Sequence, residues 1–171
     1  MKPSRIIPVV AGVAAALLLA ACSPLPGTAA ILNGERVAET TIDDAMAGCA
    51  TALGISEDQL VRAGVVRTYA LASVFDSVAA EFGELGDDEI DQLGRQQGGE
   101  QAAMIDNEQC RPLARRSIKA SMLTQLDQNA IMGILQEADI ELNPRYGTWD
   151  PSGAELFTSS SISVPVTPTQ P

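Results

Sequence analysis

The sequence predicts a mainly α protein: a single helical domain of about four to five helices, with short N- and C-terminal strands that pair. Two observations favour this fold class. Between about residues 41 and 137, apolar residues recur at intervals near 3.6, and glycine or proline interrupts them at helix-length spacings. A short segment with the turn signals or the alternating apolar residues of a strand lies on each side of this region.

The N-terminal strand pair is predicted around an Asn-Gly turn. Asn33 and Gly34 stand between two short apolar ends, residues 30–32 and Val37. Both turn residues tolerate the positive φ angles of a type I′ turn, so the sequence predicts a small hairpin here.

The first two helices are predicted from their caps and stops. A threonine oxygen at Thr41 can cap free helix amides, so the first helix should run from about Thr41 to Leu53 and end at Gly54. Ser56 and the acids after it begin a second, long helix, which should stop at Gly83.

Glycines also bound the later helices. Gly86 and the following acids open a third, short helix, which Gly98 and Gly99 close. A fourth helical stretch is predicted over about residues 100–137, with a break near Pro112. The inward-facing residues of this stretch are expected to include Leu113, Ile118, Met122, Leu126, Ile131 and Leu135.

The end of the domain has a different pattern. Ile140 and Leu142 alternate with acids, and Pro144 prevents a continuing helix. We therefore expect a short final strand that pairs with the segment near Ile31. The chain after Phe157 has no charge and is rich in Ser, Thr, Pro and Val, so a disordered tail is predicted over residues 151–171.

The first 21 residues have the pattern of a secretory signal. Lys2 and Arg5 precede an apolar run over residues 9–21. This run is too short for an ordinary transmembrane helix, which needs roughly 20 apolar residues.

The apolar run ends in Leu19-Ala20-Ala21-Cys22, which resembles the lipobox of bacterial lipoproteins. The resemblance implies cleavage before Cys22 and a diacylglyceryl group on its thiol. Residues 22–28 would then be the lipidated cysteine and its tether, and the domain would lie on the extracytoplasmic face of the cell membrane. The alternative is an ordinary secretory signal in which the cysteine stands by chance.

The mature chain is strongly acidic. Residues 22–171 contain nine Lys or Arg and 22 Asp or Glu, which gives a net charge of −13. Nucleic acids and anionic lipid surfaces should repel such a domain.

Four basic residues stand at helical spacing: Arg111, Arg115, Arg116 and Lys119. This small basic group is either a solvated helix face that balances nearby acids or a local anchor for an acidic partner.

Two cysteines remain once Cys22 carries lipid. Cys49 and Cys110 in an exported chain predict one structural disulfide, which would close a loop of about 60 residues and contribute roughly 4 kcal/mol in the chain-entropy model. A redox-active pair is the less favoured alternative, because the chain has no closely spaced C-x-x-C motif.

The sequence favours binding over catalysis. Histidine is absent, so Ser-His and Cys-His pairs are excluded and the commonest general base is missing. No cofactor or metal is expected: the acids of residues 87–91 lack the spacing of a calcium loop. A hydrolase with two paired carboxylates remains the enzymatic alternative.

Four methionines are candidates for an adaptable apolar binding groove, with core packing as the alternative: Met46, Met104, Met122 and Met132.

Two segments resemble the ends of a known helical module. Residues 30–37, AILNGERV, resemble the A-x-V-N-G-x-x-I opening of the SurA and PrsA chaperone and foldase family. Residues 142–150, LNPRYGTWD, resemble the V-N-P-R-Y-G strand of actinobacterial lipoproteins with a SurA-like N-terminal domain. The resemblance covers residues 29–150.

The resemblance implies a helical chaperone module that binds unfolded exported proteins. A parvulin prolyl isomerase domain needs more residues than this chain has left, so that activity does not carry over. Residues 143–147 are expected to be structural: Arg145 should pair with a helix-end carbonyl or a carboxylate, and Tyr146 should cover the strand pair.

The leading functional hypothesis is therefore a lipid-anchored, extracytoplasmic, chaperone-like module that binds unfolded or exported proteins. The alternative is a non-catalytic structural or accessory envelope lipoprotein that binds one fixed partner. An exposed apolar groove would favour the first hypothesis, and a flat polar surface would favour the second.

Overall fold

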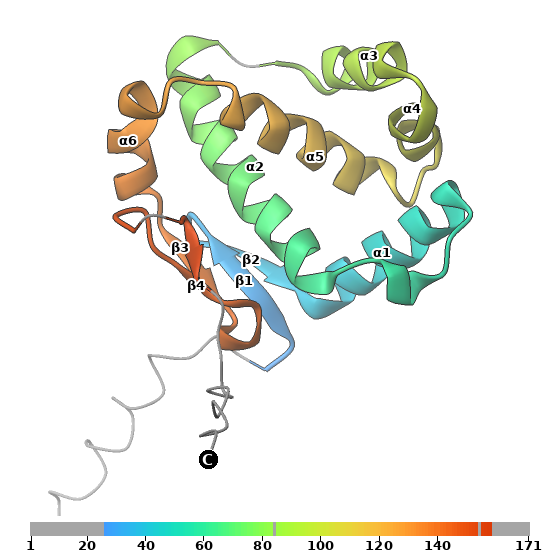
Figure 1. The fold of residues 1–171 in the computed structure, drawn as a ribbon, viewed down its shortest axis with the longest axis horizontal. Coiled ribbons are helices and arrows are strands. Elements are labelled where there is room, and N and C mark those ends of the chain that lie inside the picture. Colours follow the sequence, from blue (N-terminus) through green and yellow to red (C-terminus); the bar gives the residue numbers. More distant parts are fainter. Residues whose placement is uncertain (1–25, 84, 154, 159–171) are drawn as a thin grey trace, which may run out of the picture.

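The computed structural model describes residues 26–83, 85–153 and 155–158. The predicted signal segment, Cys22 and residues 159–171 of the predicted tail lie outside the described residues. Within them, a body of helices stands on a small antiparallel sheet (Figure 1). The predicted mainly α fold class is confirmed.

The small sheet joins the two ends of the domain. β1 (Thr28–Leu32) pairs with β2 (Glu35–Ala38) on one side and with β3 (Ile140–Leu142) on the other, both antiparallel. Asn33 and Gly34 form the turn between β1 and β2 with φ angles of 51° and 81°, as the Asn-Gly pair predicts. Ile31 lies opposite Glu141, so the predicted pairing of the final strand is also confirmed.

Six α-helices lie in the described part of the chain, more than the four to five expected. They are α1 (Glu39–Leu53), α2 (Arg62–Phe82), α3 (Asp87–Gln97), α4 (Gly99–Asp106), α5 (Arg111–Thr124) and α6 (Gln128–Glu137). Gly54 and Gly83 end α1 and α2 as predicted. Ser56 instead caps a separate 3-10 turn, η2 (Glu57–Gln59), and α2 begins only at Arg62.

The expected fourth helical stretch is divided into three helices by two side-chain caps. The carboxamide oxygen of Asn107 accepts hydrogen bonds from the amides of Gln109 and Cys110, both at 3.0 Å, and turns the chain between α4 and α5. The carboxylate of Asp127 accepts from the amide of Asn129 at 2.8 Å where α6 begins. Leu126 therefore lies in a turn and is 38% exposed, so the prediction that it faces inward is wrong.

The disulfide fixes α1 against the start of α5. Cys49 and Cys110 are both buried and are joined, with their Cα atoms 4.6 Å apart, so the predicted pairing is confirmed. Gly48 permits this close approach, because a Cβ at that position would lie 2.6 Å from Cβ of Gln109. A second, smaller apolar cluster joins α3, α4 and α5 through Ile90, Ile105, Ala114 and Ile118.

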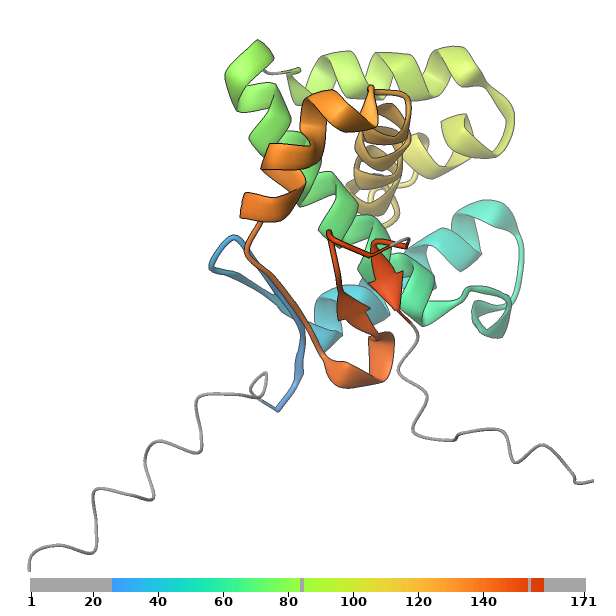
Figure 2. The ribbon, with the colours of Figure 1, turned by 60° about the vertical axis from the view of Figure 1, so that its left-hand side comes forward.

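The ordered chain extends beyond the boundary expected at Asp150. β4 (Thr148–Trp149) pairs with β5 (Phe157–Thr158), and this hairpin lies beside α2 (Figure 2). The ring of Trp149 meets that of Phe157 edge-on at 5.3 Å, and the guanidinium of Arg67 in α2 lies 5.5 Å from the Phe157 ring centre. These aromatic contacts hold β5 against β4 and α2. None of the helices in the described ranges is long and apolar enough to cross a membrane.

Candidate peptide-binding groove

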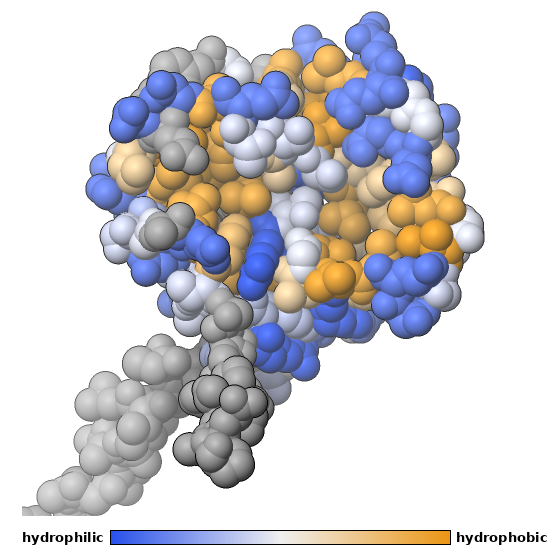
Figure 3. Space-filling model, viewed as in Figure 1, coloured by the Kyte–Doolittle hydropathy of each residue, from blue (hydrophilic) through white to orange (hydrophobic). Residues whose placement is uncertain are grey.

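An open apolar cavity of about 400 Å³ lies at the C-terminal end of α2. We call it the apolar groove. Its lining residues come from α2, the segment before α3, α5, the following turn and α6: Phe75, Val78, Ala79, Gly83, Leu85, Met122, Leu126, Asp127 and Ile131. Figure 3 shows apolar side chains gathered over α2 and α6 on this side of the molecule.

The groove forms because the helices stop before they cover one another. Phe75, Val78 and Ala79 share one face of α2 through their i, i+3, i+4 spacing. α5 ends at Thr124, so the next turn does not close over this face. Leu126 therefore remains at the rim, half in water, and Ile131 of α6 forms the opposite wall.

A smaller cavity of about 150 Å³ adjoins the apolar groove at α6, because Ile131 lines both spaces. The second cavity is bounded by α2, α5, α6 and the loop before β5, through Leu71, Leu123, Thr124, Ile131, Met132, Leu135, Pro151, Gly153 and Leu156.

The structure brings only two of the four candidate methionines to these cavities. Met122 is half-buried and lines the apolar groove, and Met132 is 38% exposed and lines the second cavity. Met46 is buried in the main core. Met104 packs, partly buried, between the two apolar clusters. Core packing is thus the role of Met46 and Met104 in this fold.

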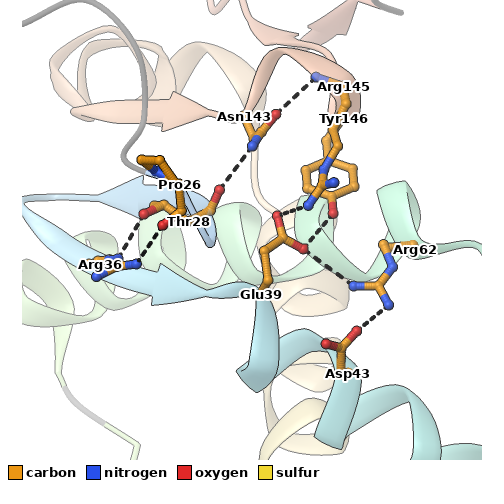
Figure 4. A network of polar contacts seen from close by, with 9 residues as sticks. All are labelled: Pro26, Thr28, Arg36, Glu39, Asp43, Arg62, Asn143, Arg145 and Tyr146. Atoms are coloured by element: carbon orange, nitrogen blue, oxygen red, sulfur yellow. Dashed lines mark hydrogen bonds and ion pairs between the residues drawn. The ribbon is translucent and has the colours of Figure 1, made fainter. Parts of the chain in front are cut away.

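A polar cluster occupies the opposite end of the domain. Glu39, in the first turn of α1, contacts Arg62 at 3.3 Å and forms an ion pair with Arg145, and the hydroxyl of Tyr146 donates to its carboxylate at 2.7 Å (Figure 4). Arg145 and Tyr146 belong to a 3-10 turn, η3 (Pro144–Tyr146). Burial and the Glu39 carboxylate raise the pKa of Tyr146. The expected pairing of Arg145 with a carboxylate is confirmed.

Asn143 extends the polar cluster to the sheet. Its side chain accepts from the amide of Arg145 at 3.3 Å and donates to the carbonyl oxygen of Thr28 at 3.0 Å. Arg36 in turn donates to the hydroxyl of Thr28 at 2.7 Å. The cluster links β1 and β2, the first turn of α1, the start of α2 and the turn after β3, which is the arrangement of a structural clamp.

The basic group of α5 binds acids on neighbouring helices. Arg115 contacts both carboxylate oxygens of Asp91, at 2.7 and 2.8 Å, and this guanidinium lowers the pKa of Asp91. Lys119 contacts Asp76 of α2 at 2.7 Å. Arg116 lies 4.3 Å from the ring centre of the buried Tyr69 and has no ion-pair partner among the described residues.

Metal binding finds no support in the described part of the chain, where no group of three or more His, Cys, Asp or Glu residues is placed to hold an ion. Comparison of the chain with protein-family models, with curated proteins and with solved structures finds no match.

Most of the groove could not be recognised from the sequence. Phe75 and Val78 lie in the apolar repeat of the predicted long helix, where apolar spacing indicates only burial. One residue of the sequence does indicate the groove. Aspartate favours helix N-caps, so Asp127 predicts a helix break beside Leu126, and such a break leaves the end of the apolar face of α2 uncovered.

Proposed function

We propose that this chain is a non-catalytic, lipid-anchored, chaperone-like module that binds unfolded segments of exported proteins on the extracytoplasmic side of the membrane. The single observation that carries the proposal is the apolar groove. It is open to solvent, and eight of its nine lining residues are apolar or glycine. A concave apolar surface of this kind is typical of binding sites rather than of an ordinary polar surface.

The chemistry of the lining suits varied apolar clients. Aliphatic and aromatic walls bind apolar side chains without directional hydrogen bonds, and Met122 can adjust its shape to different side chains. Affinity should be weak, because an unfolded segment must be ordered on binding. The net charge of −13 over residues 22–171 should keep the domain soluble while it holds an apolar segment.

Anchoring is the second part of the proposal. The lipobox-like residues 19–22 support lipid attachment at Cys22, which would hold the domain at the membrane surface where exported chains emerge. The full-length Cys22→Ser variant should leave the detergent phase in phase partitioning, whereas the parent should remain in it. Equal partitioning of the two proteins would remove the anchor from the proposal.

Light scattering of a chemically denatured exported protein tests the binding function. The chain from Ser23 to Pro171, which retains every described residue, should slow client aggregation when present in several-fold molar excess. Protection should persist at about 1 M salt, where the Debye length is about 3 Å, because apolar contact is not screened. Lack of protection across several clients would favour a module that binds one fixed envelope partner.

A further inference from the structure

The apolar groove continues along α2 and α5 into two further cavities. The bridging cavity, of about 240 Å³, is lined by Phe75, Asp76, Ala79, Leu85 and Lys119, three of which also line the groove. The basic cavity, of about 260 Å³, is lined by Asp76, Asp87, Pro112, Arg115, Arg116 and Lys119. Because Asp76 and Lys119 line both, the three spaces adjoin one another, and we call them together the track.

The basic cavity contains one cation, Arg116, that has no ion-pair partner among the described residues. Arg115 is engaged by Asp91 and by Asp87, and Lys119 is engaged by Asp76. Arg116 has no such partner and lies over the face of Tyr69. Stacking holds the guanidinium in place, but leaves its N–H groups able to bind a carboxylate.

The partner of Lys119 is also exchangeable. In this ion pair the Asp76 side chain is 49% exposed and the Lys119 side chain is 19% exposed, so water reaches the carboxylate and weakens the pair from that side. A carboxylate from a bound segment can therefore approach Lys119 and Arg116 at small cost. The basic cavity thus attracts acidic groups at short range. The net charge of −13 over residues 22–171 attracts basic ligands at long range.

We infer that the track selects client segments in which an apolar block is flanked by acidic side chains. The apolar block occupies the apolar groove, and the flanking Asp or Glu reaches Arg116 and Lys119 in the basic cavity. This inference rests on the proposed function and adds the chemical class of its client.

Three labelled peptides separate the inference from the function on which it rests. Each carries the same central Leu-Phe-Val-Phe-Leu block and blocked ends, with flanks of aspartate, serine or lysine. Fluorescence anisotropy measures their binding to the chain from Ser23 to Pro171 at about 0.15 M salt, where the Debye length is about 8 Å and long-range repulsion is largely screened. The aspartate peptide should bind about twofold to fivefold more tightly than the serine peptide, the range for a partly exposed charge contact.

Arg116→Gln should remove the preference for the aspartate peptide and leave serine-peptide binding unchanged. Arg95→Gln is the matched control and should keep the preference, because Arg95 pairs with the exposed Asp106 at 2.9 Å and lines none of the three cavities. Thermal melting of both variants checks that they are folded.

The outcomes are distinguishable. Equal binding of all three peptides, or tighter binding of the lysine peptide, would overturn the inference and leave the proposed function standing. Binding of no peptide at all would overturn both.

Discussion

The hydroxyl of Tyr146 donates a hydrogen bond of 2.7 Å to the carboxylate of Glu39, which lies 107 positions earlier in the chain. The bond joins the turn after β3 to the first turn of α1. Since Arg62 and Arg145 contact the same carboxylate, the sheet end of the domain is closed by one shared polar cluster. The apolar groove at the opposite end of α2 depends on a body fixed in this way.

Tyr146→Phe should reduce the free energy of unfolding by about 1–2 kcal/mol, because the ring stays buried but a hydrogen bond to a charged group is lost. Urea unfolding measures the change. Asp106→Asn is the control: it removes an ion pair in which both side chains are at least half exposed, and it should cost less than about 1 kcal/mol. Equal effects of the two substitutions would contradict a structural role for the polar cluster.

Gly48→Ala should destabilise the fold by about 1–3 kcal/mol, the usual cost of overpacking, because the new Cβ would lie 2.6 Å from Gln109. Gly133→Ala in α6 is the matched control, since nothing lies within 4 Å of its Cβ position. The control should gain about 0.5–1 kcal/mol, as alanine favours a helix over glycine. If Gly48→Ala were stabilising as well, α1 would not approach the start of α5 as closely as the structure shows.

Replacing both Cys49 and Cys110 by alanine should lower the free energy of unfolding by about 4 kcal/mol in the chain-entropy model, because the crosslink spans 61 positions. Thiol labelling of the parent, before and after reduction in denaturant, should detect the two sulfurs only after reduction. Two free thiols in protein purified from the envelope would show that the disulfide does not form there.

Asp91 should make the domain acid-sensitive. Its hydrogen bonds from Arg115 lower its pKa below that of an ordinary aspartate, so its stabilising contribution is complete above about pH 4 and is lost as pH falls through the folded-state pKa. Asp91→Asn should therefore show a shallower loss of unfolding free energy between about pH 5 and pH 2. Asp88→Asn, at an exposed position of the same helix, should keep the parent's slope; identical slopes for Asp91→Asn and the parent would contradict this assignment.

The parts of the fold that could be predicted from sequence are those fixed by local chemistry. Asn33 and Gly34 adopt positive φ, which few other residue types tolerate, so the hairpin was readable. Gly54 and Gly83 likewise mark helix ends. The predicted break near Pro112 is present, because α4 ends at Asp106 and α5 begins at Arg111. The break after α5 has neither glycine nor proline, and it depends on a side-chain cap that Asp127 also offers in many other contexts.

The candidate site was harder to predict, because a groove is a property of how helices end relative to one another. Apolar spacing places Phe75 and Ile131 on inward faces and cannot show that a space remains between them. The same limit applies to the methionines: Met46 and Met122 both lie in helices, but one is buried in the core and the other lines the groove.

The central claim is that the apolar groove binds unfolded clients, and a matched pair of surface substitutions tests it most directly. Leu126 lies at the groove rim and is 38% exposed. Ile55, which follows α1, is the control: it is 36% exposed and lines neither the apolar groove nor the bridging and basic cavities. Each is replaced by glutamate, and suppression of client aggregation is measured for both variants and the parent. The account predicts that Leu126→Glu loses most of the protection and Ile55→Glu keeps it. Equal protection by both variants would contradict the claim.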